Sequence, residues 1–336
     1  MGLYLHTRIP AVLALLAAVL LGIFMLDLLL GSVPIPPAHT ISALMGKLGN
    51  PLEHSIILGY RLPKALTALL AGAGLGVSGL LMQTAFRNPL AGPYILGVSA
   101  GACLGAAVAL LAVGGVLLSL PLPLALSAWL GAMLSLVLVL LASMRLRSST
   151  SLLVFGLMLS AAASAGVSVL QYWSSDQALK GFVLWSLGSM ANVHGGALWL
   201  LGGAVVVGLL LAYLCVRPLD LLLLGPEQAR HLGLSVGWSR VLIFTATTLL
   251  AGTVTAFCGP IGFIGIAAPH VARFVCRAAT HRLLITATAL VGASGLLLAD
   301  LLSQLPGVRI SLPINAVASL LGIPVVIYVL IKRPTQ

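Results

Sequence analysis

The chain has 336 residues, of which 60% are hydrophobic and only 7% are charged, and its mean hydropathy is +1.16. Soluble globular proteins carry about 25% charged residues, so this composition excludes a soluble enzyme, a secreted disulfide-stabilised domain and a disordered chain. It indicates an all-α protein that crosses a membrane many times, with one transmembrane domain over residues 1–336. Because a span with its turn takes about 30 residues, the chain can hold at most about 10 or 11 spans.

The apolar runs can be assigned to spans in chain order. The first run, from about Ile9 to Leu30, is longer than the core of a signal peptide and is predicted to be a retained span. No charged residue occurs between Arg87 and Arg145. That stretch is too long for one span, and Pro121-Leu-Pro123 marks the turn that divides it. The predicted spans cover residues 10–30, 63–86, 94–117, 122–144, 150–173, 194–216, 239–258, 260–277, 283–304 and 313–331.

The net charge of +11 comes from basic residues that stand singly or in pairs between apolar runs. This spacing is typical of loop charges that orient spans, whereas a nucleic-acid surface would need a clustered basic patch. With both termini in the cytoplasm, the inner loops and ends hold twelve Lys and Arg residues and the outer side five. The inner set is Arg8, Arg87, Arg145, Arg147, Arg217, Arg230, Arg240, Arg273, Arg277, Arg282, Lys332 and Arg333, and the outer set is Lys47, Arg61, Lys64, Lys180 and Arg309.

Glycine pairs at a spacing of four residues occur in two of the predicted spans. They include Gly72 with Gly76, Gly97 with Gly101, and Gly101 with Gly105, and such spacing lets helix backbones approach closely in lipid. Residues 74–79 also match the pattern GxGxxG. A dinucleotide site would need a preceding strand and an acidic residue about 20 positions later, so we interpret these glycines as helix packing.

Reactive and ionisable side chains are few. The four cysteines and seven histidines show no metal-ligand spacing, so no metal site is predicted. Asp27 and Asp300 lie in or near spans, where an acidic residue is a candidate for proton coupling. The alternative is a structural bond to a neighbouring helix, which we favour.

The longest predicted inner loop covers residues 217–240. Pro226 suits the first turn of a helix, Glu227 suits its positive end, and Gly233 can end it. This segment is predicted to form a short cytoplasmic helix. By itself it is equally consistent with a simple interfacial turn and with a docking site for a cytoplasmic partner.

Two long motifs resemble the FecCD class of bacterial ABC importer permeases, which carry iron chelates and cobalamin. They are QTAFRNPLAGPYILGVSAGA at residues 83–102 and GPIGFIGIAAPHVAR at residues 259–273. Three further pieces follow the family in order: Arg61-Leu-Pro-Lys64, the segment from Glu227 to Gly233, and LPINAVASLLGIP at residues 312–324. The resemblance covers nearly the whole chain.

The resemblance implies a type II importer fold with ten transmembrane helices and a homodimer in the bacterial inner membrane, surrounded by lipid. Two separate ATP-binding subunits would dock on the inner face, and a periplasmic substrate-binding protein would deliver the cargo. ATP and Mg²⁺ would therefore belong to the ATPase, and no catalytic residue, cofactor or metal is expected in this chain. The sequence itself contains no phosphate-binding loop.

The resemblance also implies roles for particular residues. Glu227, Ala229, Arg230 and Gly233 match the segment that couples to the ATPase. Asn88, Leu90, Ser149, Thr150 and Ser151 match the inner gate of the pathway, although Asn88 and the Ser/Thr run could simply cap or begin helices. Arg61, Lys64 and Arg309 match the docking positions for the binding protein, and Lys64 lacks the bidentate geometry of the more usual Arg.

Two positions depart from the family pattern. Asn315 stands where relatives usually have Gly, and residues 265–270 read GIAAPH, where Pro269, His270 and Arg273 are expected to shape a bend without a catalytic role. We expect an ATP-driven permease for a bulky metal chelate, a ferric siderophore or heme, with cobalamin as the alternative. A proton-coupled transporter that uses Asp27 or Asp300 is the alternative from another class.

Overall fold

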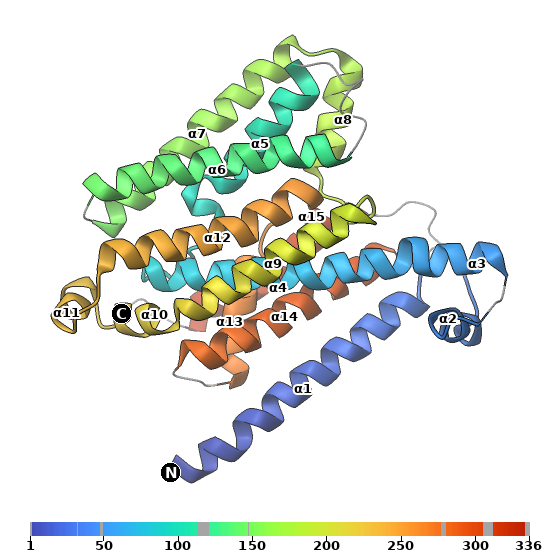
Figure 1. The fold of residues 1–336 in the computed structure, drawn as a ribbon, viewed down its shortest axis with the longest axis horizontal. Helices are drawn as coiled ribbons and strands as arrows, with labels where there is room; N and C mark the ends of the chain where they lie inside the picture. The colour runs from blue at the N-terminus through green and yellow to red at the C-terminus, as the bar shows by residue number, and fades with distance from the viewer. Residues whose placement is uncertain are drawn as a thin grey trace.

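The computed structural model describes residues 2–31, 33–47, 50–112, 121–146, 148–276, 280–304 and 312–332, which form helices joined by turns (Figure 1). The α-helices are α1 (Gly2–Leu29), α2 (Pro37–Leu44), α3 (Pro51–Ile56), α4 (Leu62–Ala85), α5 (Val98–Ala107), α6 (Pro121–Arg145), α7 (Ser149–Trp173), α8 (Asp176–Ser186), α9 (Gly196–Leu214), α10 (Val216–Leu222), α11 (Pro226–His231), α12 (Val236–Cys258), α13 (Ile264–Cys276), α14 (His281–Ser303) and α15 (Ile314–Lys332). Three shorter turns of helix are η1 (Ile57–Arg61), η2 (Pro93–Leu96) and η3 (Val108–Ala112).

Ten apolar helices account for the predicted spans. Among the described residues, seven are long enough to cross a bilayer, and three more are shorter: Val98–Ala112, Ile264–Cys276 and Ile314–Tyr328. Each predicted span coincides with one of these helices, which confirms the all-α membrane fold. The span predicted at 94–117 was too long at its start, because η2 and Gly97, with a φ of 72°, form a separate turn before α5.

Helix α4 lies at the centre of the molecule and packs against α14, α12, α13 and α9. It continues α3 and η1, so that residues 51–85 form one apolar helical segment of 35 residues. At about 1.5 Å per residue this segment is longer than the hydrocarbon core of about 30 Å. The segment therefore extends beyond that core, and the predicted span at 63–86 coincides with α4, while α3 and η1 lengthen it at its start.

Glycine allows the central helices to approach closely. A Cβ on Gly72 would collide with the backbone at Gly292 of α14, and one on Gly79 would collide with Gly265 of α13. In the same way, a Cβ on Gly101 or Gly105 would collide with the backbone of α6. The interpretation of these glycines as packing sites is confirmed, and the GxGxxG pattern lies entirely inside α4.

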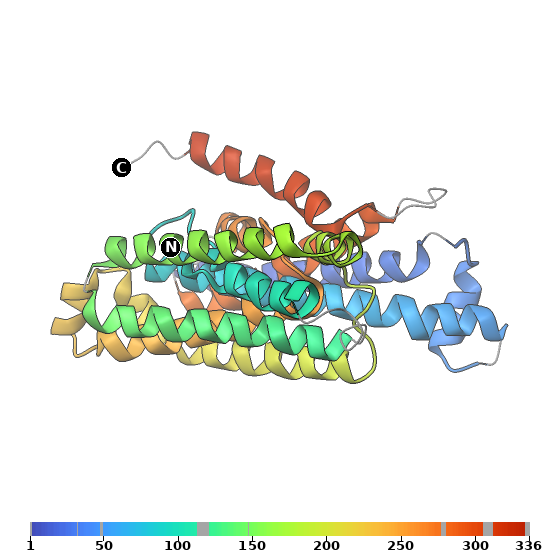
Figure 2. The ribbon, with the colours of Figure 1, turned by 90° about the horizontal axis from the view of Figure 1, so that it is seen from above.

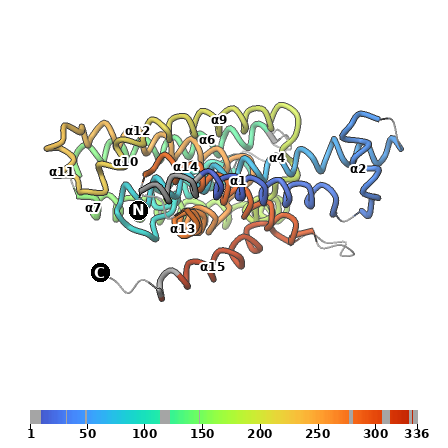
Figure 3. The backbone as a smooth tube through the Cα atoms, turned by 90° about the horizontal axis from the view of Figure 1, so that it is seen from below, coloured from blue at the N-terminus to red at the C-terminus, as the bar shows by residue number. Residues whose placement is uncertain are grey.

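The other helices surround this centre in two groups. α5, α6 and α7 pack together and reach α4 mainly through α12 (Figure 1). On another side, α1 lies against α14, and α15 lies against α13 and α14 (Figure 3).

The elongated molecule has two ends, which the views in Figures 1 and 2 both show. We call one the α11 end, where α10 and α11 lie, α4 finishes, and α7 and α12 begin. We call the other the α3 end, where α2 and α3 lie. The beginning of α1 and the end of α15 both lie toward the α11 end, which agrees with an even number of spans.

Sequence analysis missed four short helices, α2, α3, α8 and α10. α2 has eight residues, and α8 has eleven, so both are too short to span a bilayer. α8 begins at a recognisable cap, since the Ser175 side chain accepts a hydrogen bond from the Ala178 amide at 3.4 Å. Arg147, Arg277, Arg309 and Arg333, which were assigned to loops and ends, lie outside the described residues.

Candidate functional site

The segment predicted to couple to an ATPase forms a short projecting structure at the α11 end. Gly225, with a φ of 108°, begins α11, and Gly233, with a φ of 82°, follows its end. Both conformations favour glycine because it has no Cβ. The side chains of Glu227 and Arg230 are exposed, whereas Ala229 is completely buried. The predicted short helix is therefore confirmed, and Ala229 anchors it while the two charged residues face outward.

The first predicted gate segment follows α4 directly. The side-chain oxygen of Asn88 accepts a hydrogen bond from the Leu90 backbone amide at 2.9 Å, and the Asn88 backbone amide donates to the Gln83 backbone carbonyl at 3.1 Å. Asn88 thus stabilises the turn after α4, but it caps neither α4, whose C-cap is Phe86, nor η2, which begins after Gly92. The Leu90 side chain is exposed.

The second predicted gate segment begins α7. Ser148 is the cap, since its hydroxyl accepts from the Ser151 amide at 3.2 Å. Ser149 is half-buried, and Thr150 and Ser151 are exposed. These three residues therefore occupy the first turn of a helix at the same end of the molecule as Asn88.

The coupling segment lies next to both gate segments. A Cβ on Gly225 would lie 3.5 Å from Nη1 of Arg87, the residue before Asn88. After the coupling segment, α12 carries Arg240, which donates to the Leu146 carbonyl at 3.4 Å and to the Ser149 hydroxyl at 3.5 Å. Contacts between distant parts of the sequence thus bring the three segments together.

The α13 residues that were expected to shape a bend also hold the first gate segment. His270 Nε2 lies 2.7 Å from the Pro89 carbonyl oxygen, and Arg273 donates to the Gln83 side-chain carbonyl at 2.5 Å. The Gln83 amide donates to the Ile266 carbonyl at 3.2 Å. α13 therefore fixes the end of α4 and the turn that follows it.

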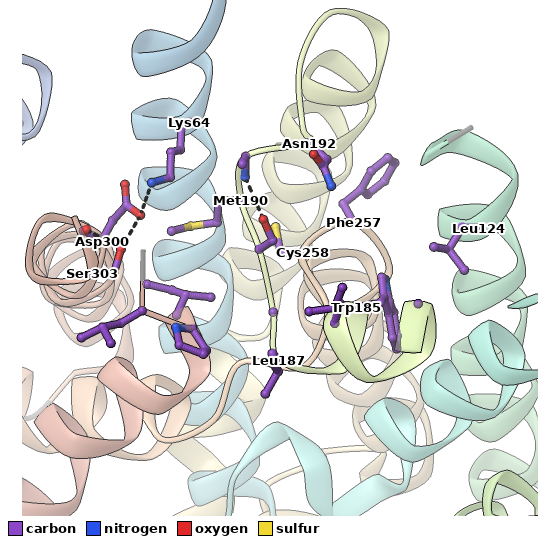
Figure 4. A pocket seen from close by; sticks show the side chains of 18 of the residues that line it. Lys64, Leu124, Trp185, Leu187, Met190, Asn192, Phe257, Cys258, Asp300 and Ser303 are labelled. Carbon is purple, nitrogen blue, oxygen red and sulfur yellow. Dashed lines mark hydrogen bonds and ion pairs between the residues drawn. The ribbon is translucent and has the colours of Figure 1, made fainter. Parts of the chain in front are cut away.

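A second feature, a buried ion pair, lies toward the α3 end. Lys64 Nζ of α4 lies 2.9 Å from Asp300 Oδ1 of α14, and both residues are buried. The pair lines a cavity of about 480 Å³, together with Ser303, Met190 and Trp185 (Figure 4). Gln304 also donates to Asp300, at 2.9 Å. The structural interpretation of Asp300 is thus supported, because it joins two central helices.

Arg61 is also held inside the protein. It is 5% exposed and donates hydrogen bonds to the carbonyls of Leu28 at 2.9 Å and Leu29 at 3.3 Å, and to that of Val33. The predicted docking role of Arg61 and Lys64 therefore remains a prediction, and both cations have partners within the chain. Asp27 is buried nearby on α1, and its Oδ1 has no hydrogen-bond partner among the described residues.

Asn315, the departure from the family pattern, has a definite role. Its side-chain oxygen accepts from the Gly262 amide at 2.9 Å and so joins the start of α15 to the turn before α13. Elsewhere in the described part of the chain, no group of three His, Cys, Asp or Glu side chains could hold a metal ion.

One further network at the α11 end was not predicted from the sequence. His281, at the start of α14, lies between Asp220 of α10 and Thr84 in the last turn of α4. Each residue is ordinary in its local sequence, and only the fold brings the three together.

Comparison with known proteins agrees with this geometry. The family model of the FecCD transport family matches residues 18–332. The vitamin B12 import system permease protein BtuC of Klebsiella pneumoniae is 37% identical over 319 residues, which cover 94% of this chain and 92% of that protein. BtuC of Escherichia coli is 37% identical over 291 residues, covering 86% of this chain and 87% of that protein.

The fold has a solved counterpart. A protein described as an inward-facing conformation of a metal-chelate type ABC transporter has a TM-score of 0.85 and 30% sequence identity to this chain, and the match covers 96% of this chain and 100% of that one. A family match from the first span to the last helix leads to one conclusion: the chain belongs to the FecCD transport family and is a multi-pass permease of the ABC importer type.

Proposed function

We propose that two copies of this chain form the membrane pathway of an ATP-driven importer for cobalamin in the bacterial inner membrane. The observation that carries the proposal is the identity of 37% to a vitamin B12 import permease over 94% of the chain. The preference for a ferric siderophore or heme, made from the sequence, is thereby replaced by cobalamin. A ferric chelate is the second candidate, because the solved counterpart is described as a metal-chelate transporter.

The energy source in this proposal is a separate ATP-hydrolysing subunit. Two such subunits would bind at the α11 end, each against the projecting α11 with Glu227, Arg230 and Gly233 exposed and Ala229 buried beneath them. This end would face the cytoplasm with both termini. Its described basic residues outside the bilayer, such as Arg87, Arg217 and Arg230, agree with the positive-inside rule.

The gate would be formed by the two segments beside α11. Leu90 and the first turn of α7, from Ser149 to Ser151, offer an apolar and a small polar surface, and the Arg240 guanidinium is bonded to the Ser149 hydroxyl. A periplasmic binding protein would dock at the α3 end. Docking through Arg61 and Lys64 would require carboxylates of the binding protein to replace the present partners of these two side chains. The third predicted docking residue, Arg309, lies outside the described residues.

The test is uptake into proteoliposomes. The chain is reconstituted with its ATPase and binding protein, and labelled cyanocobalamin, a ferric siderophore and heme are compared. We expect cobalamin uptake that requires ATP and both partners. Equal uptake without the ATPase under an imposed proton gradient would contradict the proposal and would favour a secondary transporter that uses Asp27 or Asp300.

A matched variant addresses the coupling segment. Glu227→Ala removes an exposed charge from α11 without disturbing the buried Ala229, and we expect it to lower ATP-dependent uptake. Asp176→Ala removes an exposed carboxylate from the first turn of α8 and serves as the control.

A further inference from the structure

A buried hydrogen-bond network joins three helices at the α11 end. The His281 amide and ring Nδ1 lie 3.1 and 2.6 Å from Oδ1 of Asp220 on α10. On its other side, His281 Nε2 lies 2.9 Å from the Thr84 hydroxyl of α4. His281 is 1% exposed and Thr84 is buried, so water is excluded from the contact between them, whereas the Asp220 side chain is half-buried.

The direction of each hydrogen bond follows when Asp220 is ionised and the His281 ring is neutral. An ionised carboxylate can only accept, so the His281 amide and Nδ1–H both donate to Asp220. The neutral ring then has its lone pair at Nε2, which accepts from the Thr84 hydroxyl. Asp220 thereby selects the ring tautomer that holds Thr84.

The Thr84 hydroxyl has a local alternative that it does not use. Thr67 and Thr255 donate to carbonyls four residues earlier in their own helices, at 2.8 Å in each case. A hydrogen bond of that kind would satisfy Thr84 without a link to another helix. Capping of α14 also needs only Asp220, because the His281 amide is the donor there. The contact to Thr84 therefore adds a connection that the fold of α14 does not require.

The network lies between the two functional segments. Asp220 is in the last turns of α10, which ends four residues before α11 begins, and Thr84 is four residues before Asn88. A shift of α10 would thus move His281 and, through Thr84, the turn that carries Asn88 and Leu90.

We propose that Asp220, His281 and Thr84 are positioning residues that transmit movement of the coupling segment to the first gate segment. This inference rests on the proposed function, since it needs an ATPase that acts on α11. It concerns the efficiency with which ATP hydrolysis is converted into transport, and not the binding of cargo.

The test compares three threonine variants in proteoliposomes with the ATPase and binding protein, using the cargo that the wild-type chain transports. Thr84→Val keeps the side-chain shape and removes only the hydroxyl, and Thr84→Ser keeps the hydroxyl. Thr288→Val is the matched control, because Thr288 is a buried α14 residue whose hydroxyl has no partner among the described groups. We expect Thr84→Val to lower cargo transported per ATP hydrolysed by about fivefold, the effect of one hydrogen bond. Thr84→Ser and Thr288→Val should retain the wild-type ratio.

Amide hydrogen exchange provides a second readout. In the wild-type chain, ATPase binding should change exchange at the amides of residues 88–91, and Thr84→Val should abolish that change. If Thr84→Val does not fold, Asp220→Asn weakens the same network from its more exposed end and should give the same effects.

The outcomes separate the two proposals. A wild-type chain that transports nothing with the ATPase would contradict the proposed function and this inference with it. The second outcome is a wild-type chain that works and a Thr84→Val variant with unchanged transport per ATP and unchanged exchange response. That outcome would overturn only the inference about the network, which would then be a purely structural contact.

Discussion

Helix α4 is held by a buried ion pair toward the α3 end and by hydrogen bonds at the α11 end, one of them from the Arg273 guanidinium. Toward the α3 end, Lys64 is paired with Asp300, and Arg61 binds the backbone around the end of α1. At the α11 end, Gln83 and Thr84 bind α13 and His281. The same helix thus has two different attachments, separated by most of its length.

The difference has a physical consequence. Breaking a buried ion pair leaves an uncompensated charge, which costs about 3–5 kcal/mol. Breaking a neutral hydrogen bond such as that of Thr84 costs about 1 kcal/mol, and breaking one from a charged group such as Arg273 costs about 1.5–3 kcal/mol. A conformational change is therefore easier at the α11 end, where α11 and both gate segments lie. The region around Lys64 serves as the fixed point of the helix.

The largest expected effect comes from the ion pair. Lys64→Met should lower the free energy of unfolding by about 3–5 kcal/mol, because Asp300 is left charged and unpaired. The measurement is unfolding in detergent, followed by tryptophan fluorescence. The double variant Lys64→Met with Asp300→Asn should recover part of the loss, because no lone charge remains. Equal stability of the single variant and the wild type would remove the contrast between the two ends.

Arg61 should have the next largest effect. Arg61→Met leaves backbone carbonyls of the α1–α2 connection without their charged donor, and should cost about 2–3 kcal/mol. Limited proteolysis should then cut near Val33 sooner than in the wild type. Lys180→Met, on exposed α8, is the control and should leave the cleavage rate unchanged. An unaltered rate for Arg61→Met would show that the carbonyls find other donors.

At the α11 end, the effect of Asn88 should be smaller and local. Asn88→Ala removes the acceptor for the Leu90 amide and should cost about 1 kcal/mol, as for the loss of a helix cap. Hydrogen exchange of the Leu90 amide should become faster. Asn88→Asp keeps an acceptor and should restore slow exchange, and a failure to do so would argue against the hydrogen bond.

The smallest effects are expected in and beside α11. Gly233→Ala has open space around its Cβ, but its φ of 82° should cost about 1 kcal/mol. Gly237→Ala in α12 has open space and a helical backbone, so it should stabilise the protein by about 0.5 kcal/mol. In thermal unfolding, a lower midpoint for Gly233→Ala and a higher midpoint for Gly237→Ala would confirm that only the backbone conformation distinguishes the two glycines.

Much of the architecture followed from the sequence. Apolar runs of span length, broken at Pro121, predicted the ten apolar helices, because every backbone amide in a bilayer must be bonded within a helix. Glycine spacing predicted close helix contacts, and Pro226 with Gly233 predicted the short helix α11. These features depend on residues near one another in the chain, so local pattern was sufficient.

The partners of polar side chains could not be obtained in this way. Arg61 and Lys64 were predicted to lie on the outer side and to dock a binding protein, but their partners inside the chain, the carbonyls of α1 and Asp300 of α14, were not predicted. Asp220, His281 and Thr84 had no local signature at all. A hydrogen bond or ion pair in a bilayer depends on which helices are neighbours and on how each is rotated about its axis. The sequence pattern of a single helix shows neither. The sequence by itself determined the spans and the family, and only the tertiary structure decided which charges are paired and how the coupling segment reaches the gate.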